Sequence, residues 1–149
     1  MGNTKPSDLI TLLERISPIS QAAATVTTGW VDAGKFESLL AAIQTGVLGA
    51  AATVDAKLQQ ATSSAGAGAK DVTGSAITQL VKATNDNNEV LINCQTERLD
   101  VAGGFRYVRL SVTVGTAASL IAAQLYGVGA RYQPEAHKAT MVQALHVLG

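Results

Sequence analysis

The sequence predicts an all-β fold, an antiparallel β-sandwich of the jelly-roll kind with an extension at each end. Roughly seven or eight strand-like runs of about 6 to 10 residues, rich in β-branched and apolar side chains, recur along the chain. Glycine-rich or polar turns separate these runs at short spacing. No regular alternation of strands with long helices occurs, which argues against a parallel sheet with crossover helices.

The chain of 149 residues suits a single domain, and 47% hydrophobic residues suffice for a core. We divide it into an N-terminal arm or short helix (1–20), a β-sandwich domain (21–132) and a C-terminal extension (133–149). Eleven basic and eleven acidic residues balance to a net charge of zero. Because nucleic-acid binding is driven by an excess of basic groups, we expect no direct nucleic-acid partner.

The N-terminal arm is expected to contain a short amphipathic helix over residues 8–16. Ser7 could cap this helix, and Pro18 would end it. The apolar residues at helical spacing are Leu9, Leu12, Leu13 and Ile16. Two alternatives stay open: the helix packs on its own sandwich, or it docks on a neighbouring subunit.

The first strands of the sandwich are expected within 21–60. The segment 24–34 is rich in β-branched residues and contains the sole tryptophan, Trp30, which we interpret as a core or sheet-edge anchor. The run 36–44 also fits a helical period, but its shortness and flanking glycines favour a strand. The run 53–60 alternates between apolar and polar residues, which predicts a half-buried strand with one wet face.

Three further strands are expected in the second half of the chain. The clearest is 106–114, whose inward side chains would be Val108, Leu110, Val112 and Val114. The run 89–96 is a second strand. The run 120–128 is apolar on both faces, so it should lie centrally or be covered on its second face by another chain.

The connections between these strands are predicted from their turn residues. We expect a flexible loop, a turn and a tight link at 63–69, 85–88 and 100–104, respectively. The run 76–81 is either a bent strand or one helical turn. After Tyr132, residues 136–148 are expected to form an amphipathic helix that contacts a neighbouring subunit or packs on its own sandwich.

No residue is identified as catalytic, and the chain is not expected to be an enzyme. His137 and His146 both lie in the C-terminal extension, without the spacing of a metal site. Glu89, Glu97 and Asp100 are the nearest approach to a carboxylate cluster, and we interpret them as solvated strand ends. No cofactor or metal is expected.

Cys94 is the sole cysteine, so no disulfide can form within the chain, and we interpret it as a small buried side chain. The N-terminus lacks a signal-peptide pattern, and no run of about 18 apolar residues occurs. Neither a membrane partner nor secretion is therefore expected, and assembly should take place in a cytoplasm.

Several segments in order resemble a group of small virion proteins of tailed bacteriophages. They are TGWVDAGKF, TVDAKLQQATSS, GSAITQL, LDVAGGFRYVRLSVTVG and GVGARYQP, which together cover roughly residues 28–134. The resemblance implies a β-sandwich that decorates and cements a capsid by bridging subunits of the major capsid protein. It also implies a homo-oligomer, with a trimer favoured, on the capsid exterior of a virion assembled in the host cytoplasm.

Within this hypothesis, apolar residues of both extensions are the candidate docking residues. They are Leu9, Leu12, Ile16, Met141, Leu145 and Leu148. One alternative is another virion component, such as a head-completion, head-fibre or tail-associated protein. A less favoured alternative is a carbohydrate-binding sandwich, which would need two or three aromatic side chains on one face.

Overall fold

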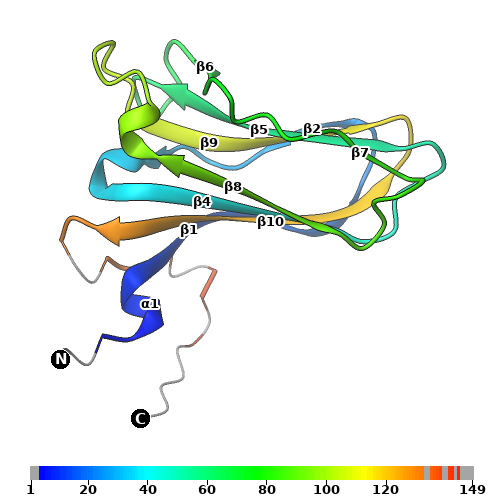
Figure 1. Ribbon diagram of the computed structural model, residues 1–149, viewed down its shortest axis with the longest axis horizontal. Coiled ribbons are helices and arrows are strands. Elements are labelled where there is room, and N and C mark those ends of the chain that lie inside the picture. Colours follow the sequence, from blue (N-terminus) through cyan, green and yellow to red (C-terminus); the bar gives the residue numbers. More distant parts are fainter. Residues whose placement is uncertain (1–3, 133–134, 139–140, 143, 145–149) are drawn as a thin grey trace.

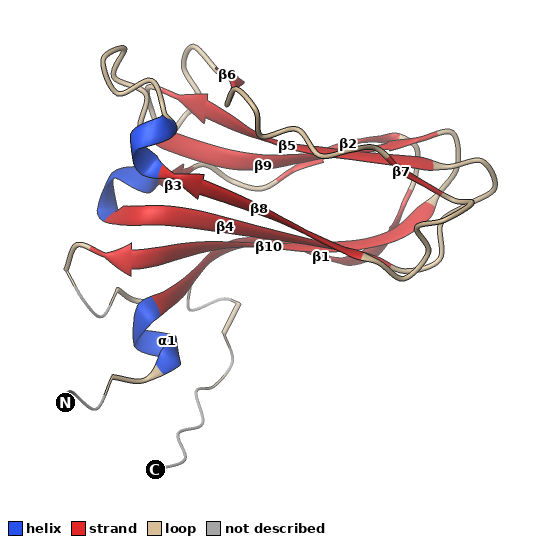
Figure 2. Cartoon of the chain, in the orientation of Figure 1, coloured by secondary structure: helices blue, strands red, loops and turns tan. Residues whose placement is uncertain are grey.

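The computed structural model describes residues 4–132, 135–138, 141–142 and 144. Two antiparallel sheets face each other across one core (Figures 1 and 2). The predicted all-β antiparallel sandwich is therefore confirmed.

Sheet A holds four strands, whereas sheet B holds the two longer strands β5 and β9 together with four short ones. In sheet A the order is β1 (Ile10–Gln21), β10 (Ser119–Ala130), β4 (Phe36–Thr45) and β8 (Glu89–Gln95). In sheet B the order is β2 (Ala24–Thr27), β9 (Tyr107–Gly115), β5 (Thr53–Ala61) and β6 (Lys70–Asp71). Two further short strands belong to this sheet: β3 (Val31–Asp32) pairs with β9, and β7 (Leu80–Val81) pairs with β5. The helical turns are α1 (Pro6–Leu9), η1 (Ala33–Lys35) and η2 (Thr96–Arg98).

The chain passes back and forth between the two sheets. β1 and β4 lie in sheet A, whereas β2 and β5 lie in sheet B, and the same crossing repeats with β8, β9 and β10. The last strand, β10, inserts between β1 and β4 and pairs with both. This double Greek-key arrangement is that of a jelly roll, as the sequence predicted.

The core lies between the sheets and is built from alternate residues of the long strands. The side chains predicted to point inward from β5 and β9 are buried, including Val54, Leu58, Leu110 and Val112. Phe36, at the start of β4, is 1% exposed and closes one end of the core. The predicted central position of the 120–128 run is confirmed, because β10 has a paired neighbour on each side.

The predicted N-terminal helix is wrong beyond Leu9. Among the described residues 4–21, only α1 is helical, with Lys5 rather than Ser7 at its N-cap, and residues 10–21 form β1. The pairing of β1 with β10 shifts register between Leu12 and Glu14 and again near Pro18. These irregularities place apolar residues at a spacing that imitates a helix, and sheet pairing decides the outcome. Residues 10–20 thus belong to the sandwich, not to an arm.

Two smaller predictions differ from the structure. Within 76–81, only β7 is a strand, and Ile77 N–H donates to Ala56 O of β5 without regular structure around it. In the C-terminal extension, the described residues 135–138, 141–142 and 144 are not helical. Lys138 N–H instead donates to Leu12 O, so this segment lies along the edge of β1.

Candidate functional site

The outer face of sheet A combines apolar side chains with the uncharged polar ones of Ser38, Gln44, Asn93, Gln95 and Gln124. Register and alternation direct the following apolar side chains away from the core: Leu12 from β1, Leu40 and Ala42 from β4, Leu91 from β8, and Leu120, Ala122, Tyr126 and Val128 from β10. We call this set the apolar face. Leu91 and Leu120 are 59% and 46% exposed, so the face is open to solvent at these points. The charged residues that share this side, Arg15 and Glu89, lie on the edge strands β1 and β8.

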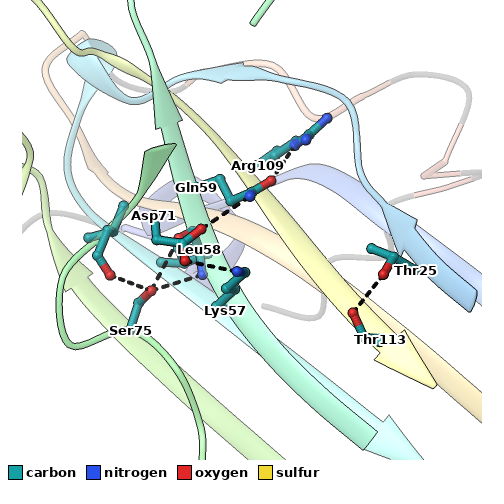
Figure 3. A network of polar contacts seen from close by, with 9 residues as sticks. Thr25, Lys57, Leu58, Gln59, Asp71, Ser75, Arg109 and Thr113 are labelled. Carbon is teal, nitrogen blue, oxygen red and sulfur yellow. Dashed lines mark hydrogen bonds and ion pairs between the residues drawn. The ribbon is translucent and has the colours of Figure 1, made fainter. Parts of the chain in front are cut away.

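The outer face of sheet B is polar and internally bonded (Figure 3). Lys57 Nζ donates to Asp71 Oδ2 at 2.8 Å, and Gln59 Nε2 donates to the other oxygen of that carboxylate at 3.2 Å. Arg109 Nε in turn donates to Gln59 Oε1 at 2.9 Å. Lys57, and secondarily Gln59, lower the pKa of Asp71 by bonding to its ionised form. The result is a chain of charge-assisted hydrogen bonds across β5 and β9.

Trp30 is enclosed by its neighbours on this side of the molecule. The Arg109 guanidinium lies over its ring, 4.6 Å from the centroid. Gly66, at φ +84°, brings its backbone so near that a Cβ there would lie 2.6 Å from Trp30 Nε1. The indole is therefore a packing anchor whose ring is already covered by a cation, which is a poor platform for stacking a sugar.

The two edges of sheet A differ. At β1, Leu12 N–H donates to Nδ1 of His137 at 3.0 Å, and Leu12 O accepts from Lys138 N–H. Nε2 of His137 lies 3.0 Å from Ser7 O, and Lys138 pairs with Glu14. The C-terminal segment thus covers the β1 edge near the start of the strand. A long edge strand normally carries such cover, because its unpaired backbone groups would otherwise pair with another chain.

The β8 edge has no such cover among the residues that the structure describes. Thr45 N–H donates to Asn88 O at 2.8 Å, which identifies 45 and 88 as a bonded pair of the β4–β8 ladder. Bonded and non-bonded pairs alternate in an antiparallel ladder, so every second residue of β8 directs its backbone groups outward. These residues are Glu89, Leu91, Asn93 and Gln95.

An open cleft of about 820 Å³ lies at the end of the sandwich where β8 finishes. Arg106 holds Asp32 in a two-bond ion pair, with both N–O distances 2.8 Å, and this pairing raises the pKa of Arg106. Arg131 Nε donates to Gly34 O at 2.8 Å. Among the described residues, those that line the cleft include no histidine, serine or cysteine. We interpret both guanidinium groups as ties that fix the loops at this end.

The docking residues predicted from the sequence are not gathered into one surface. Leu9 is 44% exposed at the end of α1, and Leu12 belongs to the apolar face. Ile16 is 6% exposed and part of the core, so its prediction as a docking residue is wrong. Met141 is partly buried. Leu145 and Leu148 lie outside the described residues.

The acidic side chains and the cysteine considered in the sequence analysis are also separated from one another. Glu89 begins β8 and Glu97 lies in η2, beyond the other end of that strand, while Asp100 pairs with Lys70 at 2.6 Å. Lys70, then Gly103 N–H, lower the pKa of Asp100. Cys94 is 6% exposed, and burial raises the pKa of its thiol.

Among the described residues, histidine, cysteine and acidic side chains do not come together in a group of three or more that could hold a metal ion. No described helix is long and apolar enough to cross a membrane.

The apolar face and the open edge were missed by sequence reasoning. The signal for the face was present, since 120–128 is apolar on both sides and the 36–44 run holds adjacent leucines. The position of β8 at an edge had no signal, because strand order comes from pairings between distant segments.

Comparisons with known proteins identify no family. No family model matches the chain, and no curated protein matches its sequence. One similar solved structure comes from work on Bacillus endospore appendages, described as a novel family of disulfide-linked pili. It is 13% identical, with 87% of this chain and 99% of that chain covered and a TM-score of 0.38. Similarity at this level carries no argument about fold or function.

Proposed function

We propose that this chain is a structural protein of an assembly, acting through its surfaces rather than by catalysis. Its most specific form is a decoration protein that cements the capsid of a tailed bacteriophage, bridging subunits of the major capsid protein. The resemblance of residues 28–134 to small virion proteins motivates that form. The observation that carries the proposal is the contrast between the apolar face of sheet A and the bonded polar face of sheet B.

The apolar face is the surface that would dock on the shell. Four strands spaced about 4.8 Å apart and roughly ten residues long present about 600 Å². A stable interface buries about 800 Å² per partner, so a single copy would attach weakly. Many identical copies on one shell act together, and avidity then compensates for the modest affinity of each.

The partner surface is defined by its chemistry. The middle of the apolar face has no charged side chain, with Arg15 and Glu89 at its margins. A charged patch on the partner would lose its hydration there without gaining a counter-ion. We therefore expect an uncharged, apolar patch on the capsid exterior. The polar face of sheet B would then point to solvent.

Binding to shells tests this proposal. The chain is co-expressed with the major capsid protein of a tailed bacteriophage, and shells are purified by gradient sedimentation. Leu120→Lys should weaken co-sedimentation, because it places a charge at one end of the apolar face at a side chain that is 46% exposed. Thr25→Lys, on the exposed side of β2, is the matched control and should bind as the unmodified chain does.

Copy number separates this role from other virion roles. Many copies spread over the shell indicate cement, whereas one small ring indicates a head-completion or tail-associated protein. Failure of the unmodified chain to sediment with shells, or equal binding by Leu120→Lys, would overturn the proposal.

A further inference from the structure

We infer that β8 pairs with β8 of a second copy of this chain, joining two sandwiches through one continuous sheet. The inference concerns a sheet edge, so it stands apart from the proposed contact between the apolar face and a shell. It names the surface of self-association, which nothing above assigns.

The edge is available by geometry. Glu89, Leu91, Asn93 and Gln95 direct their backbone N–H and C=O groups away from β4. The pairing of β4 with β10 supports this direction independently. Gly46 N–H donates to Leu120 O, so the even-numbered residues of β4 bond to β10 and the odd-numbered ones to β8.

The sequence of β8 has none of the features that protect an edge. Its residues EVLINCQ include no proline and no lysine, and the pairing with β4 has no bulge from Ser38 to Gln44. Its one charge, Glu89, stands at the start of the strand. The opposite edge of the same sheet is treated differently, because the segment around His137 and Lys138 covers β1.

A second copy fits this edge because the strand is complementary to itself. Antiparallel pairing about Ile92 overlaps all of β8 and sets Leu91 opposite Asn93 of the other copy, and Glu89 opposite Gln95. These are the residues whose backbone groups point outward, so four bonded pairs form, with about eight hydrogen bonds. No like charges meet, and the two Ile92 side chains meet at the symmetry axis.

The resulting dimer is a two-fold pair with an eight-stranded sheet. Its two-fold axis is perpendicular to the sheet, so both apolar faces lie on the same side. The pair would present about twice the apolar area of one chain. This two-fold arrangement differs from the trimer that the family resemblance favours, and the mass of the particle in solution distinguishes them.

Light scattering coupled to size-exclusion chromatography tests the inference on the full chain. We expect a mass twice the 15.3 kDa of one chain. Leu91→Pro should give a monomer of unchanged circular dichroism, because it removes an outward N–H and leaves the bonds to β4 intact. Leu91→Ala is the matched control: it removes the same side chain, keeps the N–H, and should remain a dimer.

Crosslinking tests the register and does not depend on tolerance of proline. In a Cys94→Ser background, the double variant Leu91→Cys with Asn93→Cys should form disulfide-linked dimers, while each single variant should form few. A monomeric or trimeric unmodified chain would overturn the inference. So would a dimer that Leu91→Pro leaves intact, or equal crosslinking by the single variants. Leu120→Lys should keep the dimer, so loss of shell binding and loss of pairing are measured separately.

Discussion

The two outer faces of this sandwich are built on opposite principles. On sheet B, outward side chains from β5 and β9 bond to one another, and Arg109 continues the chain of bonds onto Trp30. On sheet A, outward leucines and alanines lie among uncharged polar side chains such as Gln124 and Asn93, and the charges lie at the margins alone. The polar side chains on the outer face of sheet B bond to one another, whereas the outer face of sheet A leaves apolar side chains exposed to water.

The comparison teaches that whole-chain composition conceals an asymmetry. A net charge of zero describes the sum of eleven basic and eleven acidic residues. The side chains that carry charge across the middle of an outer face, such as Lys57 and Arg109, belong to sheet B. The average would suit two equally mixed faces, but the structure separates them. Function should therefore be sought by comparing faces.

The largest expected loss of stability comes from a substitution that disrupts the packing beneath the apolar face. Gly127 of β10 lies against the buried Phe36 ring, and a Cβ there would come within 2.5 Å of ring atoms. Gly127→Ala should lower the free energy of unfolding by about 1–3 kcal/mol, because the ring has no space to shift into. Urea denaturation measures the loss.

Sheet B supplies the control for that substitution. A Cβ at Gly115 would meet the hydroxyl of Thr53 at 2.4 Å, and this hydroxyl can rotate away. Gly115→Ala should therefore cost less than Gly127→Ala. An equal cost would mean that the backbone rather than the neighbouring side chain sets the penalty.

A smaller effect compares the faces directly. Arg109→Ala removes a hydrogen bond to Gln59 and a cation from the face of Trp30, so it should destabilise the fold by about 1 kcal/mol. Leu120→Ser should change stability by less than about 0.5 kcal/mol, because the leucine is already largely in water. Thermal denaturation of both variants decides the matter. Comparable losses would remove the distinction between a bonded face and an open one.

The smallest effect is the part of the pH dependence of stability that Asp71 of sheet B contributes. Because Lys57 lowers the pKa of Asp71 in the folded state, the folded chain binds fewer protons than the unfolded chain near the ordinary value of 3.8. That stabilisation is present above pH 3.8 and is lost as pH falls through the lowered value. Melting temperatures at pH 7 and pH 3 should therefore differ less in Asp71→Asn than in the unmodified chain. An identical difference would show that the Lys57 pair contributes nothing.

The sequence predicted the sandwich where alternation was clean. In 53–60 and 106–114 one face of each strand is buried, so period-two patterning was a reliable guide to Val54 and Leu110. It failed at residues 8–16, since the irregular register of β1 spaces its apolar residues like those of a helix. Sheet pairing between segments far apart in the chain overrode the local preference there.

The candidate surfaces were less predictable. Because the run 120–128 is apolar on both sides, the sequence indicated that its outward side chains belong to an apolar surface. The sequence did not indicate that Leu40 lies beside Tyr126 on that surface. The β8 edge depends on strand order, which local patterning does not encode. Ile16 was chosen as a docking residue for its hydrophobicity, and that same property buries it in the core.

The insertion of β10 between β1 and β4 has a consequence for how the protein is made. Of these strands, the ribosome releases β1 first and β10 last, yet β1 has its strand partner in β10 alone among the described strands. A nascent chain must therefore carry an unmatched first strand until β10 has been made. Closure of sheet A is then a late, long-range event, which favours slow folding and exposes the unfinished chain to chaperones.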